Sequence, residues 1–174
     1  SNCVNRSNLI NAGLFQAAWF ACVLGGAVGT IWWGGVALLA LLAFSWSKPF
    51  LKSDLLFAAT GGLLGLALDT LWIRTGVLDY DGASLAPAWI VMLWVGVSLT
   101  LNHSLSLFAS RPLLGGLLAG SCAPLSYLGG ERLGAVLVPD PWMLGYICAV
   151  WFVVFTLAFA LAGGWRPSRQ EAAL

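Results

Sequence analysis

The side chains in this sequence that could do chemistry lie inside long apolar segments. His103 is the only histidine among the 174 residues, and Asn102 precedes it directly. An imidazole changes its charge near neutral pH, so we predict His103 as a catalytic proton carrier, with Asn102 contacting the ligand. Three further side chains fall on one side of an earlier apolar segment and are predicted to bind the same ligand: Asn11, Gln16 and Trp19. The alternative is that these groups only hydrogen-bond with one another between helices.

A second candidate catalytic residue, Asp69, lies in the third apolar segment. Gly62 and Gly65 precede it with the spacing of one helix face, and glycine lets another helix approach closely. Asp69 is therefore predicted to face the interior of a helix bundle, where an ionisable group in a membrane is a candidate functional residue. We predict a base, a proton carrier or a ligand anchor. The alternative is a structural bond to Tyr127 or Arg132.

The fifth apolar segment supplies the remaining candidate ligand-binding residues, Tyr127, Glu131 and Arg132. Tyr127 and Glu131 share a helix face with Pro124, which removes a backbone hydrogen bond and predicts a kink. Because a kink in a membrane helix makes room for a cavity, we predict a ligand site beside it. The alternative for Glu131 and Arg132 is a charged pair at the membrane interface.

The composition of the chain indicates an integral membrane protein. Apolar residues make up 60% of the sequence and charged residues 9%, against about 25% charged residues in a typical soluble domain. This excludes a soluble globular domain, and it excludes a nucleic-acid-binding protein, which needs a basic surface. The ten tryptophans and 21 glycines agree, because tryptophan favours membrane interfaces and glycine favours close helix packing in lipid.

Continuous apolar segments predict an all-α fold, a polytopic bundle of six transmembrane helices. A helix needs about 20 apolar residues to cross the roughly 30 Å hydrocarbon core. The predicted spans are 9–28, 31–46, 55–77, 85–108, 112–138 and 142–163. The second span has only about 16 clearly apolar residues, so a five-span bundle is the alternative. Because the connections are short, we expect neighbouring helices to form antiparallel hairpins, and because the spans leave no stretch for a soluble domain, we expect residues 1–174 to form a single transmembrane domain.

The positions of the basic residues predict the orientation of the bundle. With six spans and a cytoplasmic N-terminus, six of the eight basic residues fall on the cytoplasmic side, as the positive-inside rule requires. These six are Arg6, Lys48, Lys52, Arg111, Arg166 and Arg169, whereas Arg74 and Arg132 fall on the outer side. Both termini are therefore predicted to be cytoplasmic.

The cysteines and the single histidine predict neither a metal site nor a cofactor. Cys22, Cys122 and Cys148 lie inside predicted spans, and the sequence has no Cys-x-x-Cys pair. One histidine excludes a haem held by two histidines. A haem held by His103 alone, or a metal held by His103 with carboxylates, is the alternative.

Several short motifs, spread over nearly the whole chain, resemble those of a bacterial family. They are Phe15-Gln16-Ala17-Ala18-Trp19-Phe20-Ala21-Cys22-Val23, Leu68-Asp69, Leu101-Asn102-His103-Ser104, and Pro124-Leu125-Ser126-Tyr127 followed by Leu133-Gly134. On these residues the chain resembles the inner-membrane family catalogued as domain of unknown function 2878. The resemblance implies a multi-pass protein of the bacterial inner (cytoplasmic) membrane, supplies no established activity, and favours a connection with lipids.

Three functions from different classes fit these observations. The first, which we favour, is that the bundle binds or modifies a lipid or lipophilic small molecule in an internal polar cavity. The second is a small-molecule transport or substrate-capture subunit, because the size and topology are similar to those of the S-components of vitamin transporters. The third is a structural subunit of a membrane complex. The expected partners are membrane lipids, a lipophilic small molecule or another membrane protein, and the sequence leaves open whether the protein is an enzyme.

Overall fold

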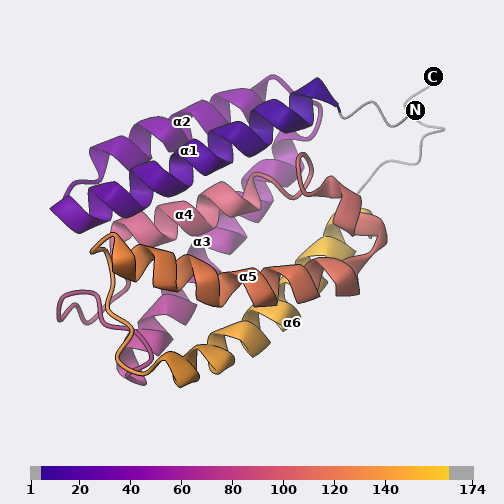
Figure 1. Ribbon diagram of the computed structural model, residues 1–174. Coiled ribbons are helices and arrows are strands. Elements are labelled where there is room, and N and C mark those ends of the chain that lie inside the picture. Colours follow the sequence, from indigo (N-terminus) through magenta and orange to yellow (C-terminus); the bar gives the residue numbers. More distant parts are fainter. Residues whose placement is uncertain (1–4, 165–174) are drawn as a thin grey trace, which may run out of the picture.

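The computed structural model describes residues 5–164, and helices dominate this part of the chain (Figure 1). The α-helices are α1 (Arg6–Val28), α2 (Trp32–Trp46), α3 (Leu51–Arg74), α4 (Ala88–Ser98), α5 (Pro112–Arg132) and α6 (Leu144–Gly164), and the 3-10 helices are η1 (Ser106–Ser110) and η2 (Pro141–Met143). Within residues 5–164 the only β-pairing is an isolated bridge between Asp79 and Leu137. The predicted all-α class is confirmed.

Four helical segments are long and apolar enough to cross a membrane, namely α1, α3, α5 and the stretch Pro141–Gly164 that contains α6. They support the prediction of a membrane protein. The helices α2 and α4 are shorter, with 15 and 11 residues. At 1.5 Å per residue α4 covers roughly 16 Å, about half of the hydrocarbon core. Residues 5–164 thus contain six α-helices, of which four belong to candidate spans, and the six-span topology stays a prediction.

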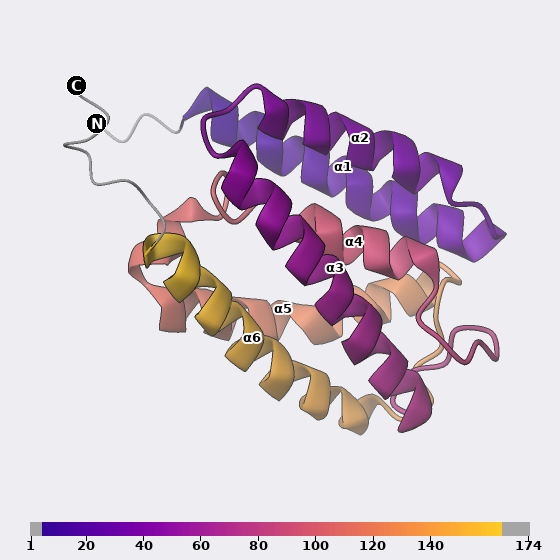
Figure 2. The ribbon, with the colours of Figure 1, turned by 180° about the vertical axis from the view of Figure 1, so that it is seen from behind.

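The helices pair along the chain into three hairpins, α1 with α2, α3 with α4, and α5 with α6 (Figure 1). Helix α4 also contacts α1 and α2, so it lies at the centre of the first four helices, while α5 packs mainly against α6 (Figure 2). We call the end of the bundle where α1 and α3 begin the terminal end. The opposite end, where α4 and α6 begin, is the loop end.

The basic residues of the described chain divide between these two ends. Arg6, Lys48, Lys52 and Arg111 lie at the terminal end, and Arg74 and Arg132 close α3 and α5 at the loop end. Arg166 and Arg169 lie outside the described residues. The positive-inside rule assigns the end with more basic residues, here the terminal end, to the cytoplasm. That the terminal end is cytoplasmic stays a prediction.

The prediction of one continuous helix over 85–108 is wrong. Helix α4 ends at Ser98, and the chain continues through turns until η1 begins at Ser106. The hydroxyls of Ser98 and Thr100 donate hydrogen bonds to carbonyl oxygens of the preceding turn. Serine, threonine and asparagine side chains compete with the backbone in this way, and a count of apolar residues does not register that competition.

The predicted span 112–138 also ends earlier than expected, because α5 ends at Arg132. Beyond it, the backbone N–H of Leu137 donates to the carbonyl of Asp79 at 2.7 Å, and the N–H of Asp79 donates to the carbonyl of Leu137 at 2.9 Å. These bonds join the α3–α4 loop to the α5–α6 loop. The two loops at the loop end are therefore ordered by hydrogen bonds to each other.

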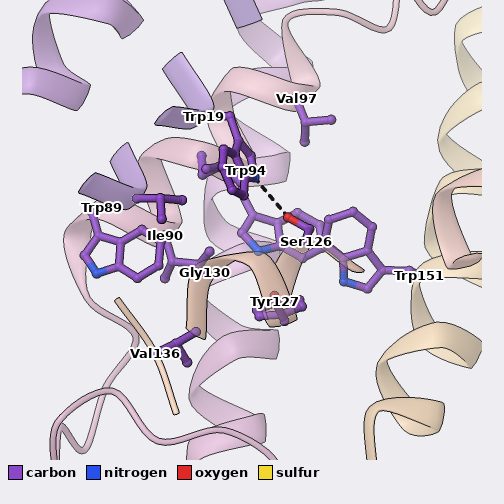
Figure 3. Close-up of a pocket in the computed structure, with 12 residues that line it drawn as sticks. Trp19, Trp89, Ile90, Trp94, Val97, Ser126, Tyr127, Gly130, Val136 and Trp151 are labelled. Carbon is purple, nitrogen blue, oxygen red and sulfur yellow. Dashed lines mark hydrogen bonds between the residues drawn. The ribbon is translucent and has the colours of Figure 1, made fainter. Parts of the chain in front are cut away.

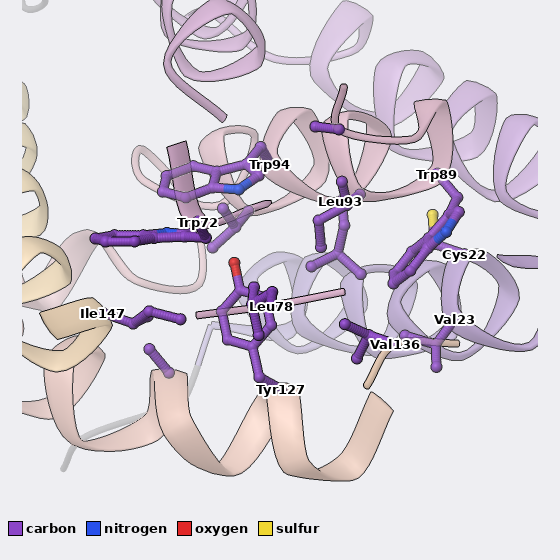
Figure 4. Packing of buried hydrophobic residues seen from close by; sticks show 14 of the residues in the cluster. Cys22, Val23, Trp72, Leu78, Trp89, Leu93, Trp94, Tyr127, Val136 and Ile147 are labelled. Carbon is purple, nitrogen blue, oxygen red and sulfur yellow. The ribbon is translucent and has the colours of Figure 1, made fainter. Parts of the chain in front are cut away.

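Large aromatic side chains fill the space between α4 and α6. Trp94 packs against Trp151 and Phe155, with ring centroids 4.8 and 6.1 Å apart, and Figure 4 shows Trp72 beside Trp94 in this cluster. Gly65 of α3 leaves room for Trp94, because a Cβ added at Gly65 would lie 2.2 Å from the indole Cγ. The glycine at this position thus admits an indole ring.

We expect Gly65→Ala to lower the free energy of unfolding by about 1–3 kcal/mol, because the added methyl group overlaps the ring of Trp94. Gly13→Ala is the matched control, since no atom lies within 4 Å of the position of its added Cβ. It replaces glycine by alanine inside α1 and should leave the stability unchanged or raise it. Thermal unfolding in detergent compares the two variants, and equal apparent Tm values would contradict this packing.

Candidate functional site

The carboxylate of Asp69 lies at the centre of a buried hydrogen-bond cluster. Its side chain is fully buried in α3. The hydroxyl of Tyr80 donates to Oδ1 at 2.5 Å, and Nε1 of Trp94 donates to Oδ2 at 2.7 Å. The hydroxyl of Tyr127 lies 3.0 Å from Oδ1 and 3.1 Å from Oδ2. Three donors therefore replace the water that a buried carboxylate loses.

Each residue of this cluster comes from a different part of the fold. Asp69 belongs to α3, Trp94 to α4 and Tyr127 to α5, while Tyr80 lies in the loop between α3 and α4. Figure 4 shows Tyr127 rising from α5 with its hydroxyl directed toward the tryptophans above it. The bond from Tyr127 is thus a polar link between the α3–α4 hairpin and the α5–α6 hairpin. We call these four residues the Asp69 cluster.

Tyr80 acts as a stable donor in the Asp69 cluster. Burial raises the pKa of the Tyr80 hydroxyl well above its ordinary value, and the neighbouring Tyr127 and Asp69 raise it further. The phenol therefore keeps its proton over the physiological pH range and remains a hydrogen-bond donor to Asp69.

Of the two partners predicted for Asp69, the structure contains one. Tyr127 bonds to Asp69, whereas the exposed Arg132 at the end of α5 is not among the partners of that carboxylate in the described chain. Glu131 accepts a hydrogen bond from the backbone N–H of Val138. Its carboxylate therefore ties the end of α5 to the later part of the α5–α6 connection.

A second buried cluster surrounds the carboxylate of Asp54. Nε2 of His103 lies 2.6 Å from Oδ2 of Asp54, and Nδ2 of Asn102 donates to Oδ1 at 2.8 Å. The same amide nitrogen lies 3.0 Å from the hydroxyl of Ser53. Asp54 is fully buried and His103 is 4% exposed, with the ring of Phe44 packed edge-on against the imidazole at 5.2 Å. We call these side chains the Asp54 cluster.

Asn11 satisfies the backbone where α4 stops. Its Nδ2 donates to the carbonyl of Leu99 at 3.2 Å, and its Oδ1 accepts from both the backbone N–H and the hydroxyl of Ser104. Irregular backbone inside a membrane protein is tolerated only where such partners are present. Asn11 and the Asp54 cluster together hold the turns between α4 and η1 against α1 and α3.

The predicted grouping of Asn11, Gln16 and Trp19 with His103 does not form as one site. Trp19 turns away from the Asp54 cluster, and its Nε1 donates to the hydroxyl of Ser126 at 3.0 Å. Gln16 lies on the exposed face of α1. The physical reason is the helical rotation between these positions, which carries only one of the three, Asn11, to the end of α4.

A small aromatic cavity adjoins the Asp69 cluster (Figure 3). It measures about 20 Å³, and its lining includes Trp19, Trp89, Trp94, Tyr127 and Trp151. A volume of this size holds about one water molecule. The bundle interior therefore has far less free space here than the predicted internal ligand cavity requires.

Two larger cavities open at the surface. At the loop end, a vestibule of about 760 Å³ is lined by side chains that include Asp79, Tyr80, Asp81, Trp89 and Glu131. A lateral groove of about 510 Å³ runs between α3 and α6, lined by residues that include Leu56, Thr60, Leu64, Trp94, Ser98, Val154, Ala158 and Leu161. Tyr80 lines the vestibule and Trp94 lines the lateral groove. Both residues donate a hydrogen bond to the buried carboxylate of Asp69.

A family model described as "Protein of unknown function (DUF2878)" matches residues 8–157. The chain belongs to this family. The match includes the Asp69 and Asp54 clusters, and it confirms the resemblance that the short motifs predict. The description of the DUF2878 family assigns no activity. No curated protein and no solved structure matches this family member.

The sequence reasoning missed three central residues of this DUF2878 member: Asp54, Tyr80 and Trp94. Asp54 falls before the predicted start of the third span, but α3 begins at Leu51 and includes it. The signal was present, because Asp54 and Asp69 share one helix face at a spacing of 15 residues. Tyr80 falls in the connection between the predicted spans 55–77 and 85–108, and Trp94 is one of the apolar residues by which the span 85–108 is predicted.

The described residues offer no ready metal site. Among residues 5–164 no group of three or more His, Cys, Asp and Glu side chains is arranged to hold a metal ion. The cysteines of this part are free, with Cys22 buried, Cys148 half-buried and Cys122 exposed. The two clusters consist of hydrogen bonds that carboxylates accept from phenol, indole, amide and imidazole groups.

Proposed function

We propose that this membrane protein binds the hydrocarbon part of a lipid or lipophilic small molecule in the lateral groove between α3 and α6. The observation that carries the proposal is the groove itself. Its volume of about 510 Å³ falls in the roughly 300–1,000 Å³ range of ligand pockets. Figure 2 shows α3 and α6, which carry most of the groove lining, on the near side of the bundle.

The walls of the groove suit an alkyl chain. Leu56 of α3 and Leu161 of α6 stand 48% and 57% exposed, and Ala158 of α6 leaves space between the walls. Because lipid tails are as apolar as leucine, burial alone gives little selectivity in a membrane. Selectivity then comes from shape, since a chain that fills the groove makes contacts on three sides.

The floor of the groove is rigid, because Trp94 and Ser98 are held in place. Nε1 of Trp94 donates to Asp69 at 2.7 Å, and the hydroxyl of Ser98 donates to the backbone carbonyl of Trp94 at 2.8 Å. A site whose side chains are already fixed loses little conformational entropy on binding. The Asp69 cluster thus supports the proposed site by orienting its aromatic floor.

The position of the groove fits one leaflet of a bilayer. From Leu56 to Leu64 the α3 wall extends for about 12 Å, starting near the terminal end. This is less than half of a roughly 30 Å hydrocarbon core. We propose that the chain of a lipid from the leaflet at the terminal end occupies it, in the bacterial inner membrane, with that end facing the cytoplasm.

The proposal concerns binding, and a reaction catalysed by His103 or Asp69 stays a prediction. Neither residue lines one of the three cavities described above, and the imidazole makes edge contacts with the rings of Phe44 and Phe50. A substrate would reach His103 only after movement of these rings. The groove needs no such movement, so lipid binding is the function that the geometry favours.

Filling the groove should abolish lipid retention. Ala158→Phe places a ring in the groove, whereas Ala160→Phe adds the same ring at an exposed position of α6 outside the groove lining. We expect native mass spectrometry of detergent-extracted protein to find a retained lipophilic species on wild type and Ala160→Phe, and little on Ala158→Phe. Thr60→Trp, which fills the groove from α3, should repeat the loss. Equal retention by all four folded proteins would contradict the proposal.

A further inference from the structure

The vestibule at the loop end has the features of a second binding site, distinct from the groove. Its lining includes three of the seven acidic residues of the chain, Asp79, Asp81 and Glu131, and none of its lining residues is basic. Its volume of about 760 Å³ lies within the range of small-molecule pockets. A cavity with one sign of charge concentrates ligands of the opposite charge.

An indole N–H without a partner points to a ligand in this vestibule. Trp89 is 7% exposed, and within residues 5–164 its Nε1 has no hydrogen-bond partner. A Cβ added at Gly26, which lines the vestibule, would lie 2.6 Å from this nitrogen. Figure 3 shows the nitrogen directed away from the small aromatic cavity. The nitrogen itself is not fully buried, and Trp89 lines the vestibule, so an acceptor can reach this N–H from there.

Two aromatic rings form a corner of the same cavity. The rings of Tyr80 and Trp89 have centroids 5.7 Å apart and meet at 70°. Both residues line the vestibule, and a cation that approaches the face of an aromatic ring is attracted by it, most strongly in the case of tryptophan. The acidic side chains add charge that a neutral aromatic corner lacks.

The arrangement favours an organic cation over a metal ion. A calcium ion needs six to eight oxygen ligands at about 2.3–2.6 Å, and the acidic side chains of the described residues do not converge in groups of three or more. Glu131 and Asp79 already accept backbone N–H bonds from Val138 and Gly82. Carboxylates spread around a wide cavity fit a larger cation with diffuse charge.

We propose that the vestibule binds an organic ammonium group that carries a neighbouring oxygen, as in an amino alcohol or the headgroup of a lipid that contains one. The ammonium lies between the acidic side chains of the vestibule and the rings of Tyr80 and Trp89. The neighbouring oxygen accepts a hydrogen bond from the indole N–H of Trp89. This site is independent of the alkyl groove, because the two cavities share no lining residue.

Binding of radiolabelled choline to the purified protein in detergent tests this proposal, with unlabelled ethanolamine as competitor. We expect saturable binding that Asp81→Asn weakens about five- to ten-fold. Asparagine suits this position, because Asp81 has a positive φ of 54°. Trp89→Phe keeps a ring but removes the N–H, and it should also weaken binding. Asp140→Asn, a loop-end carboxylate outside the vestibule lining, is the control and should bind choline as wild type does.

Two further arms separate the sources of the ligand and the two proposed sites. If nanodiscs of phosphatidylethanolamine block choline binding and nanodiscs of phosphatidylglycerol do not, the ligand is a lipid headgroup; choline binding in both identifies a free amine. Ala158→Phe should leave choline binding unchanged, so failure of the groove and failure of the vestibule are distinguishable. Absence of saturable choline and ethanolamine binding, or equal binding by wild type, Asp81→Asn and Trp89→Phe, would overturn the proposal.

Discussion

Replacing Asp69 by alanine should lower the free energy of unfolding by about 3 kcal/mol, the largest loss that we expect from one side chain. The truncation leaves three buried donors, on Tyr80, Trp94 and Tyr127, without their acceptor. It also breaks the bond between the α3–α4 hairpin and α5. At roughly 2–4 °C per kcal/mol for a chain of this size, the apparent Tm in detergent should fall by about 6–12 °C.

The conservative variant Asp69→Asn separates loss of the acceptor from loss of the side chain. An amide keeps one oxygen but turns its NH₂ group toward a donor, so we expect a fall in Tm about half as large. Asp81→Asn makes the same chemical change on an exposed residue and should leave the Tm within about 1 °C. If Asp69→Ala and Asp81→Asn unfold at the same temperature, the Asp69 cluster does not hold the hairpins together.

The second large effect is expected at Asp54, whose carboxylate bonds to both His103 and Asn102. Asp54→Ala should cost about 2–3 kcal/mol, because the buried imidazole of His103 loses its partner and the amide of Asn102 loses one of its two acceptors beside the turns that follow α4. A double-mutant cycle of Asp54→Asn with His103→Gln, read by thermal unfolding, should give a coupling energy above about 1 kcal/mol. The exposed Lys52→Ala in the same turn of α3 serves as control. Additive effects of Asp54→Asn and His103→Gln would show that the 2.6 Å contact contributes nothing specific.

The sequence predicts the helices well where hydrophobicity alone determines them. The helices α1, α2 and α6 begin and end within a few residues of the predicted spans, because each is predominantly apolar. The inward direction of Asp69 was also predictable, since the helix period and the glycines before it are sufficient. Hydrophobicity does not encode the break after Ser98. The turns that follow it are held by hydrogen bonds to Asn11, which is 88 residues from Leu99 and 93 residues from Ser104 in the sequence.

The partners of the candidate site were harder to predict than its members. Tyr127 was predicted as a partner of Asp69, but Trp94 donates to the same carboxylate from an entirely apolar stretch of α4. Trp94 bonds to Asp69 through its indole N–H, a polar group that a count of apolar residues does not register. Tyr80 reaches Asp69 because the loop after α3 folds back over the bundle. The β-bridge between Asp79 and Leu137 holds this loop in place. It is a long-range contact, which a local sequence pattern does not predict.

The measurement that tests the central claim most directly is photo-cross-linking of the wild-type protein in bilayers with a phospholipid that carries a diazirine in its acyl chain. If the groove between α3 and α6 binds a lipid chain, the labelled peptides should be enriched in residues 56–64 and 154–161, and Ala158→Phe should remove that enrichment while Ala160→Phe keeps it. The exposed apolar face of α2, which includes Val36 and Leu39, reports the background of non-specific lipid contact. Labelling of α2 equal to that of the groove would contradict the account.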